Sequence, residues 1–226
     1  MQLKYQLRRP AVPDGRPPLL VLLHAKGDNE HNMAALATRL DPRFLTLSLQ
    51  APFALTGTGY RWFNTGQTAA AGSLATTEAE HSRLAVIQCI NDAVMGFGVD
   101  PRRVYLLGFS QGATLAWSIA LTAPRLLRGV VGIAGCVLPE IAARQPPTEA
   151  VGHLTVFIQH GVHDPVIARA KAQATRDLWV DLGAMMGYRE YAAAHELTPS
   201  MELDAAEFLH TQLNRLSGIG QTTGDH

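Results

Sequence analysis

The sequence predicts a single-domain α/β fold with a mostly parallel central sheet and helices on both of its faces. Short apolar runs, of the kind that form buried strands, alternate with stretches whose apolar residues have helical spacing. This alternation runs along the 226 residues without an internal repeat or a change in composition. Because α/β folds of about 200–250 residues are often one unit, we expect one domain over residues 1–216 and a flexible tail over 217–226.

The predicted strands are short apolar or alternating runs. They cover residues 2–9, 19–24, 43–51, 103–109, 129–135, 154–161 and 188–195. The first alternates in polarity and is followed by a Pro- and Gly-rich stretch, which suits the edge of a sheet. The second, LLVLLH, is almost wholly apolar, as expected of a strand that helices cover on both sides.

The predicted helices have apolar residues at helical spacing. They cover residues 31–40, 77–98, 111–123, 164–184 and 200–216. The first ends before Asp41-Pro42, and the second has Gly98 near its end, which are common helix stop signals. Residues 52–75 carry Gly, Thr and aromatic residues with no period, so we expect a long irregular loop with a functional role.

Composition and charge exclude several classes of protein. Apolar residues make up 47% of the chain, charged residues 17%, and the net charge is zero, so a large core is expected and no Lys/Arg run marks a nucleic-acid or membrane partner. Residues 1–18 lack the apolar h-region that a signal peptide would have, and the apolar run at 19–23 is too short to cross a bilayer. Cys89 and Cys136 lack metal-site spacing and are expected to be buried free thiols, and the nine histidines form no metal motif. We expect a cytoplasmic protein with no cofactor, no metal and no stable membrane insertion.

One serine lies where an α/β fold places its chemistry. Ser110 is the centre of GFSQG, between the strand predicted at 103–109 and the helix predicted at 111–123. Ligands gather at the carboxyl ends of parallel strands, and Gly-x-Ser-x-Gly between strand and helix is the nucleophile elbow. Gly108 and Gly112 are needed there because side chains would collide with the neighbouring strand and helix. The bare pattern arises by chance in about one chain in ten, so context carries the prediction, and the alternative is an ordinary serine in a tight turn.

A catalytic serine needs a base, and the base needs an orienting acid. In this kind of fold the chain order is Ser, then Asp or Glu, then His. His195 lies at the carboxyl end of the last predicted strand, whereas His210 lies inside a predicted helix, so we predict His195 as the base. Asp164 follows the strand at 154–161 and is the predicted acid. Its alternative role is a helix N-cap, because it precedes Pro165 and a helical pattern.

The reacting oxygen also needs an oxyanion hole made of two backbone N–H groups. One is predicted from Gln111, the residue after the serine, and the other from the loop after 19–24. In that loop we choose Lys26, with Ala25 as the neighbouring alternative, and expect His24 to brace the loop. His160, close to Asp164, is expected to be a structural or rim residue.

Several motifs together resemble one family. They are LLHxxGD at 22–28, AP at 51–52 with RWFN at 61–64, GFSQGA at 108–113, GCVLP at 135–139, HGVHDPV at 160–166 and HEL at 195–197. This combination resembles the phospholipase/carboxylesterase family of α/β-hydrolases, which includes acyl-protein thioesterases, and it extends over nearly the whole chain. The resemblance implies an α/β-hydrolase fold, a triad of Ser110, Asp164 and His195, and an oxyanion hole from the N–H groups of Lys26 and Gln111. Many relatives are dimers, so a homodimer is a further expectation.

Two positions depart from the family pattern. Ala25 stands where such proteins usually have glycine, and Lys26 stands where they often have an apolar residue. A cation at the pocket mouth predicts a preference for acidic or polar acyl groups. The loop at 52–75 is expected to roof the acyl pocket, with Trp62 and Phe63 as wall residues, the alternative being that both aromatics are core.

These residues favour a serine esterase that acts on a small-molecule ester. Ser110 would attack an ester or thioester carbonyl, with His195 as base, Asp164 fixing its tautomer, and water hydrolysing the acyl-enzyme. Carboxylesterase action comes first and lysophospholipase or thioesterase action second. The alternatives are a non-catalytic protein that holds a small ligand in the same pocket, and a peptidase, since the same groups cleave amides.

Overall fold

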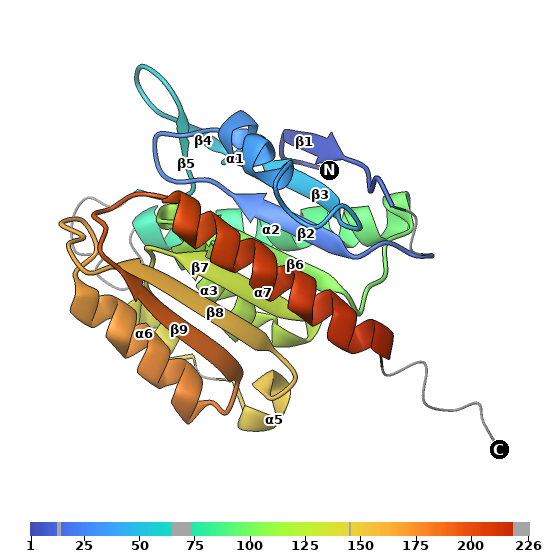
Figure 1. The fold of residues 1–226 in the computed structure, drawn as a ribbon. Helices are drawn as coiled ribbons and strands as arrows, with labels where there is room; N and C mark the ends of the chain where they lie inside the picture. Colours follow the sequence, from blue (N-terminus) through green and yellow to red (C-terminus); the bar gives the residue numbers. More distant parts are fainter. Residues whose placement is uncertain (13–14, 65–73, 145, 219–226) are drawn as a thin grey trace.

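The computed structural model describes residues 1–12, 15–64, 74–144 and 146–218 (Figure 1). Its main sheet has seven strands in the order β1-β3-β2-β6-β7-β8-β9. The strands are β1 Tyr5–Arg8, β2 Leu19–Leu23, β3 Leu45–Leu49, β6 Val104–Phe109, β7 Gly129–Ile133, β8 Thr155–Gly161 and β9 Met185–Tyr191. Strand β1 pairs antiparallel with β3 at one edge, and the remaining pairs are parallel. The prediction of a mostly parallel sheet with an edge strand near the N-terminus is confirmed.

Helices cover both faces of this sheet (Figure 1). Helices α1 Glu30–Ala37 and α7 Pro199–Gly218 pack on one face, and α2 Leu74–Phe97, α3 Gln111–Thr122 and α6 Arg169–Asp181 pack on the other. Alternate residues of β2 serve the two layers. Leu20 and Leu22 belong to the core under α1 and α7, while Leu19, Val21 and Leu23 belong to the core under α2, α3 and α6. A strand buried on both faces must be apolar throughout, which explains the run LLVLL.

The irregular loop expected at 52–75 is partly wrong. It contains a two-stranded antiparallel sheet, β4 Phe53–Ala54 and β5 Tyr60–Arg61, and helix α2 already begins at Leu74. Two-residue strands are too short to show an alternating pattern, so the sequence could not indicate them. Residues 65–73 of this stretch lie outside the described part of the chain.

The segments around β8 also differ from expectation. Between β7 and β8, where no helix is predicted, the chain forms two short helices, α4 Pro139–Ala142 and α5 Thr148–Val151, and a 3₁₀ turn at Pro124–Leu126 follows α3. The helix predicted from residue 164 begins only at Arg169. At the C-terminus α7 extends through Gly218, so the tail expected at 217–226 is helical at its first two residues, and the rest lies outside the described chain. Within the described residues, no helix combines the length and the apolarity that a membrane span requires.

Candidate active site

Ser110 occupies a strained turn between β6 and α3. Its φ is 54° and its ψ is −115°, a left-handed conformation that a residue with a side chain rarely adopts. The Ser110 N–H donates to the Ile133 carbonyl at the end of β7 (2.8 Å), and the Ser110 carbonyl accepts from the Thr114 N–H (3.0 Å). The neighbouring strand and the first turn of α3 therefore fix the backbone of this serine.

The two glycines of GFSQG are required by close backbone contacts. A Cβ on Gly112 would lie 2.1 Å from the Leu23 carbonyl oxygen, at the end of β2. A Cβ on Gly108 would lie 2.5 Å from the backbone nitrogen of Ala113 in α3. A side chain at either position would therefore collide with the neighbouring strand or helix, as the sequence predicts. Because both residues are glycine, α3 can start close to the sheet.

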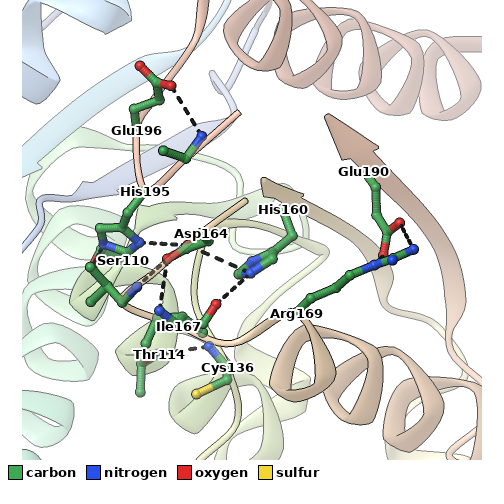
Figure 2. A network of polar contacts seen from close by, with 12 residues as sticks. Ser110, Thr114, Cys136, His160, Asp164, Ile167, Arg169, Glu190, His195 and Glu196 are labelled. Carbon is green, nitrogen blue, oxygen red and sulfur yellow. Dashed lines mark hydrogen bonds and ion pairs between the residues drawn. The ribbon is translucent and has the colours of Figure 1, made fainter. Parts of the chain in front are cut away.

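Ser110, His195 and Asp164 form a continuous line of hydrogen bonds (Figure 2). Ser110 Oγ lies 2.8 Å from His195 Nε2, and His195 Nδ1 lies 2.7 Å from Asp164 Oδ2. The three residues follow β6, β9 and β8, so they meet at the carboxyl ends of parallel strands although they are far apart in the chain. The ring of Phe109 stacks on the His195 imidazole, with centroids 5.5 Å apart and planes at 29°. The imidazole is held on one face and at both nitrogens.

The Asp164 carboxylate is buried, and both of its oxygens accept hydrogen bonds. Its Oδ1 accepts the N–H groups of Val166 and Ile167, both at 2.8 Å. Burial alone would raise the pKa of Asp164, but the hydrogen bonds from His195 and from the two N–H groups outweigh it and lower the pKa. Asp164 is therefore ionised and can hold the proton on His195 Nδ1. The alternative role as a helix N-cap is wrong, because the N-cap of α6 is Ala168 and the Asp164 side chain caps the turn before that helix instead.

His160 contacts the turn at residues 164–167 that the Asp164 carboxylate closes. Its side chain is fully buried, and its Nε2 lies 2.9 Å from the Ile167 carbonyl oxygen and 3.7 Å from Asp164 Oδ2 (Figure 2). Among the described residues, its Nδ1 has no hydrogen-bond partner. The sequence indicates a structural histidine here but not the turn that it holds, because that contact depends on where the side chain points.

The loop after β2 lies beside the serine turn. Leu23 at the end of β2 pairs with Gly108 of β6, so the segments that carry Lys26 and Gln111 leave neighbouring strands at the same level. Lys26 is exposed, and next to it the Gly27 N–H donates to the Tyr60 carbonyl (2.8 Å). The Gln111 N–H belongs to the first turn of α3, where backbone N–H groups have no acceptor within the helix.

His24 braces this loop, as the sequence suggests. The ring is buried, the Ala51 N–H donates to its Nε2 (3.0 Å), and its Nδ1 therefore carries the proton and donates to the Ala25 carbonyl (2.7 Å). Burial lowers the pKa of His24, which keeps the ring neutral. In the described chain the non-glycine residues with positive φ are Ser110 and Ala134, so Ala25 is accommodated without the left-handed geometry that would require glycine.

The Gln111 side chain holds the two aromatic candidates in place. Its Nε2 donates to the Phe63 carbonyl (2.7 Å), and its Oε1 accepts the Trp62 N–H (2.8 Å). The Trp62 indole is wholly buried in the core and donates through Nε1 to the His24 carbonyl (2.8 Å). Phe63 is mostly buried and lines a cavity of about 440 Å³ beside α3, whereas Trp62 is not among the lining residues. The sequence indicated both aromatics and the Gln111 N–H, but it carries no signal that the Gln111 side chain holds the backbone of Trp62 and Phe63.

Comparison with known sequences decides the family. The sequence profile described as Phospholipase/Carboxylesterase matches residues 12–213. The chain belongs to this family. Members of the family are hydrolases of the serine type, and the sheet order and the parallel strands described above agree with an α/β-hydrolase fold. No group of three or more His, Cys, Asp or Glu among the described residues is placed to hold a metal ion.

The similar proteins are distant, and they match different shares of the chain. The protein from Neurospora crassa named acyl-protein thioesterase 1 is 26% identical over 89% of this chain and 94% of its own. The Gibberella zeae protein of the same name is 32% identical, but over only 51% of each chain, so the match spans about half of that relative. Among solved structures, the Bacillus cereus carboxylesterase has a TM-score of 0.79 at 22% identity and covers 93% of this chain and 95% of its own, which establishes the fold.

Proposed function

We propose that this protein is a serine esterase that hydrolyses carboxylic ester or thioester bonds through an acyl-enzyme on Ser110. The observation that carries the proposal is the unbroken line from Ser110 Oγ through His195 to Asp164, at 2.8 and 2.7 Å. These distances are within hydrogen-bond reach for proton transfer from the serine to a base. The ionised Asp164 keeps the proton on Nδ1, so Nε2 is left free to accept the serine proton.

The proposed reaction has two halves. Ser110 Oγ attacks the carbonyl carbon while His195 Nε2 takes its proton, and the N–H groups of Lys26 and Gln111 receive the developing oxyanion. His195 then gives that proton to the departing alcohol or thiol, which leaves Ser110 esterified. Water attacks this acyl-enzyme, His195 takes a proton from the water, and the acid product leaves as Ser110 recovers its proton.

The choice between substrates depends on the relatives. Fungal proteins named acyl-protein thioesterase 1 support a thioester substrate, while the structural neighbour named carboxylesterase shares only the fold. The family description Phospholipase/Carboxylesterase, which covers residues 12–213, supports a carboxylic ester, so we keep small carboxylic esters as the first substrate class and acyl thioesters or lysophospholipids as the second. A non-catalytic binding protein is the competing hypothesis, and the complete Ser-His-Asp line speaks against it because a binder needs no such line. A cytoplasmic location and a homodimer remain predictions.

Ser110→Ala tests the proposal directly. Wild type and variant are incubated with a fluorophosphonate probe and with p-nitrophenyl acetate. We expect labelling at Ser110 in the wild type only, and a fall in kcat of about 10⁴-fold or more in the variant. Ser200→Ala, the same change at an exposed serine of α7, is the matched control and should retain full labelling and turnover.

Absence of labelling and of turnover in the wild type would contradict the esterase proposal. In that case the binding-protein hypothesis becomes the better one. Labelling at a different serine would retain hydrolase activity but remove Ser110 from it.

A further inference from the structure

The proposed base His195 lies on a loop rather than on a helix or a strand. Strand β9 ends at Tyr191 and helix α7 begins at Pro199, so His195 belongs to the connection between them, which we call the His195 loop, residues 192–198 (Figure 1). A loop holds a functional group less precisely than a strand or a helix does, and a displacement of about 1 Å can lower a rate about 100-fold. Proton transfer between Ser110 and His195 therefore requires contacts that fix this loop.

One buried glutamine contacts both ends of the His195 loop. Gln159 lies in β8 and is fully buried. Its Nε2 donates to the Tyr191 hydroxyl (2.5 Å) and to the Met201 carbonyl (3.0 Å). Tyr191 is the last residue of β9, and Met201 lies in the first turn of α7. A single amide thus joins the strand before the loop to the helix after it.

The direction of these hydrogen bonds is fixed by chemistry. A carbonyl only accepts, so the Gln159 amide has to present its NH₂ group to Met201. The Tyr191 hydroxyl accepts from the same group and donates to Asp204 Oδ2 in α7 (2.5 Å), and Arg189 also contacts that carboxylate (2.8 Å). Burial and the hydrogen bond to Asp204 raise the pKa of Tyr191, so its hydroxyl keeps the proton that it donates. The end of β9 is therefore joined to α7 both through Asp204 and through Gln159.

Backbone contacts hold the first half of the His195 loop against the end of β8. The His163 N–H donates to the Ala193 carbonyl (3.0 Å). The Ala194 carbonyl oxygen lies so close to Gly161 that a Cβ on this glycine would be 2.3 Å from it. The second half of the loop, after His195, is held at its far end by the glutamine amide described above.

We propose that the Gln159 amide and the Tyr191 hydroxyl are positioning groups for the proposed base, and that they hold the His195 loop so that His195 Nε2 stays 2.8 Å from Ser110 Oγ. They act through the two ends of the loop and not on the reacting atoms. Without them the imidazole would occupy a wider range of positions, and proton transfer to and from it would slow. This inference rests on the esterase activity proposed above.

Tyr191→Phe tests the assignment, because it removes the hydroxyl and keeps the ring. Its matched control is Tyr188→Phe in the same strand. The Tyr188 hydroxyl also donates to a carboxylate, that of Glu190 (2.6 Å), but Glu190 is bound by Arg169 of α6, on the other face of the sheet. Each enzyme is assayed with phenyl acetate and p-nitrophenyl acetate, which share the acyl group. Phenoxide is the poorer leaving group, so its departure depends more on a proton from His195.

The two esters should respond unequally to loss of the hydroxyl. We expect kcat/KM of Tyr191→Phe to fall about 30-fold for phenyl acetate and about five-fold for p-nitrophenyl acetate, whereas Tyr188→Phe should keep wild-type values for both. Gln159→Leu places an apolar residue of similar size at the same buried site and removes both hydrogen bonds, so it should show the same inequality with larger losses. Circular dichroism and urea unfolding give the folded fraction of each variant, to which the rates are normalised.

A merely structural role would lower the folded fraction and leave the activity of each folded molecule unchanged. Wild-type values per folded molecule in Tyr191→Phe, equal losses on the two esters, or the same loss in Tyr188→Phe would each overturn the inference, while wild-type turnover and Ser110 labelling would still support the esterase. If Gln159→Leu does not fold, Tyr191→Phe decides alone. Absence of wild-type turnover with both esters would instead overturn the proposed function, and this inference with it.

Discussion

The backbone of Ser110 is held in an unfavourable conformation by hydrogen bonds to its neighbours. A left-handed φ of 54° on a serine costs about 1–3 kcal/mol. The hydrogen bond from its N–H to the Ile133 carbonyl and the one from the Thr114 N–H to its own carbonyl fix the turn from both sides. This turn places the Ser110 hydroxyl at the carboxyl end of the sheet, 2.8 Å from His195 Nε2.

Gly112→Ala should disrupt this turn. The added Cβ would lie 2.1 Å from the Leu23 carbonyl oxygen, so α3 would have to move away from β2. We expect a loss of about 3 kcal/mol or more in the free energy of unfolding, measured by urea denaturation. Gly96→Ala is the matched control, because no atom lies within 4 Å of its added Cβ and the position is inside α2. That change should stabilise the protein by about 0.5–1 kcal/mol, and a similar loss in both variants would contradict the collision.

Asp164→Asn tests the role of the buried carboxylate. The amide can present its N–H₂ group to His195 Nδ1 and so favour the wrong tautomer, which leaves Nε2 protonated and unable to accept from Ser110. We expect kcat on p-nitrophenyl acetate to fall by about 10⁴-fold. Asp177→Asn, at an exposed position of α6, should have no effect on turnover. Activity within ten-fold of wild type in Asp164→Asn would remove Asp164 from the proposed mechanism.

At the residue scale, sequence reasoning placed Ser110, Asp164 and His195 together because each follows a predicted strand. The carboxyl ends of parallel strands converge, so position in the chain was enough to bring these residues to one edge of the sheet. His160 and the Gln111 side chain could not be placed in the same way. Their contacts with Ile167, Trp62 and Phe63 depend on side-chain direction across the fold, which no spacing in the sequence indicates.

At the scale of elements, the start of α3 is fastened to the segment that follows β5. The Gln111 side chain satisfies both the Trp62 N–H and the Phe63 carbonyl in a buried setting. Gln111→Ala should leave both groups without a partner and destabilise the protein by about 2 kcal/mol or more in urea unfolding. Gln88→Ala, at an exposed position of α2 where the glutamine side chain donates to Asp92, should change stability by less than about 0.5 kcal/mol. Equal effects of the two changes would argue that the buried pair contributes nothing specific.

The contact between α7 and the loop before β3 should stabilise the protein less as the pH falls. Asp41 is buried, and it accepts hydrogen bonds from Arg43 and lies 2.6 Å from His210 Nδ1 on α7. Burial alone would raise the pKa of Asp41, but the hydrogen bonds from Arg43 and His210 lower it to about 2. Since the folded-state pKa is lower than the unfolded value of 3.8, the stabilisation is present above pH 3.8 and is lost as the pH falls from there toward 2.

Asp41→Asn isolates this contribution. The free energy of unfolding is measured between pH 6 and pH 2 for both proteins. We expect the wild type to be more stable by about 1 kcal/mol at pH 6, after allowance for screening by solvent, and the difference to shrink below pH 3.8. A difference that stays constant over this range would show that Asp41 contributes by packing rather than by charge.

Element boundaries were the weakest part of the sequence reasoning. The helix expected from residue 164 starts at Arg169, because the Asp164 carboxylate takes the N–H groups of Val166 and Ile167 and closes a separate turn. The Asp164 carboxylate accepts backbone N–H groups two and three residues later, as a helix N-cap does, but here these hydrogen bonds close a turn that ends before α6 begins. Strands buried on both faces were predicted well. Each face packs against helices, so every residue of the strand has to be apolar and the strand is visible as a continuous apolar run.

At the scale of the whole molecule, one sheet carries two cores, and both cysteines are buried. Cys89 on α2 is fully buried in the core under α2, α3 and α6, and Cys136, just after β7, is 6% exposed. Burial raises the pKa of both thiols, so the reactive thiolate is scarce in the folded protein. Neither thiol is paired in a disulfide.

The thiols therefore report on opening of the core that holds Cys89 and of the region around Cys136. With 5,5′-dithiobis(2-nitrobenzoate) at neutral pH, we expect the native protein to react slowly and the protein in 6 M guanidinium chloride to release two equivalents at once. If these two regions open together, Gly112→Ala should speed the native reaction of both cysteines, and Gly96→Ala should slow it, because both changes act on the unfolding equilibrium. Rapid reaction of Cys136 alone, with Cys89 unreactive, would show instead that the region around Ser110 opens separately from the core beneath α2.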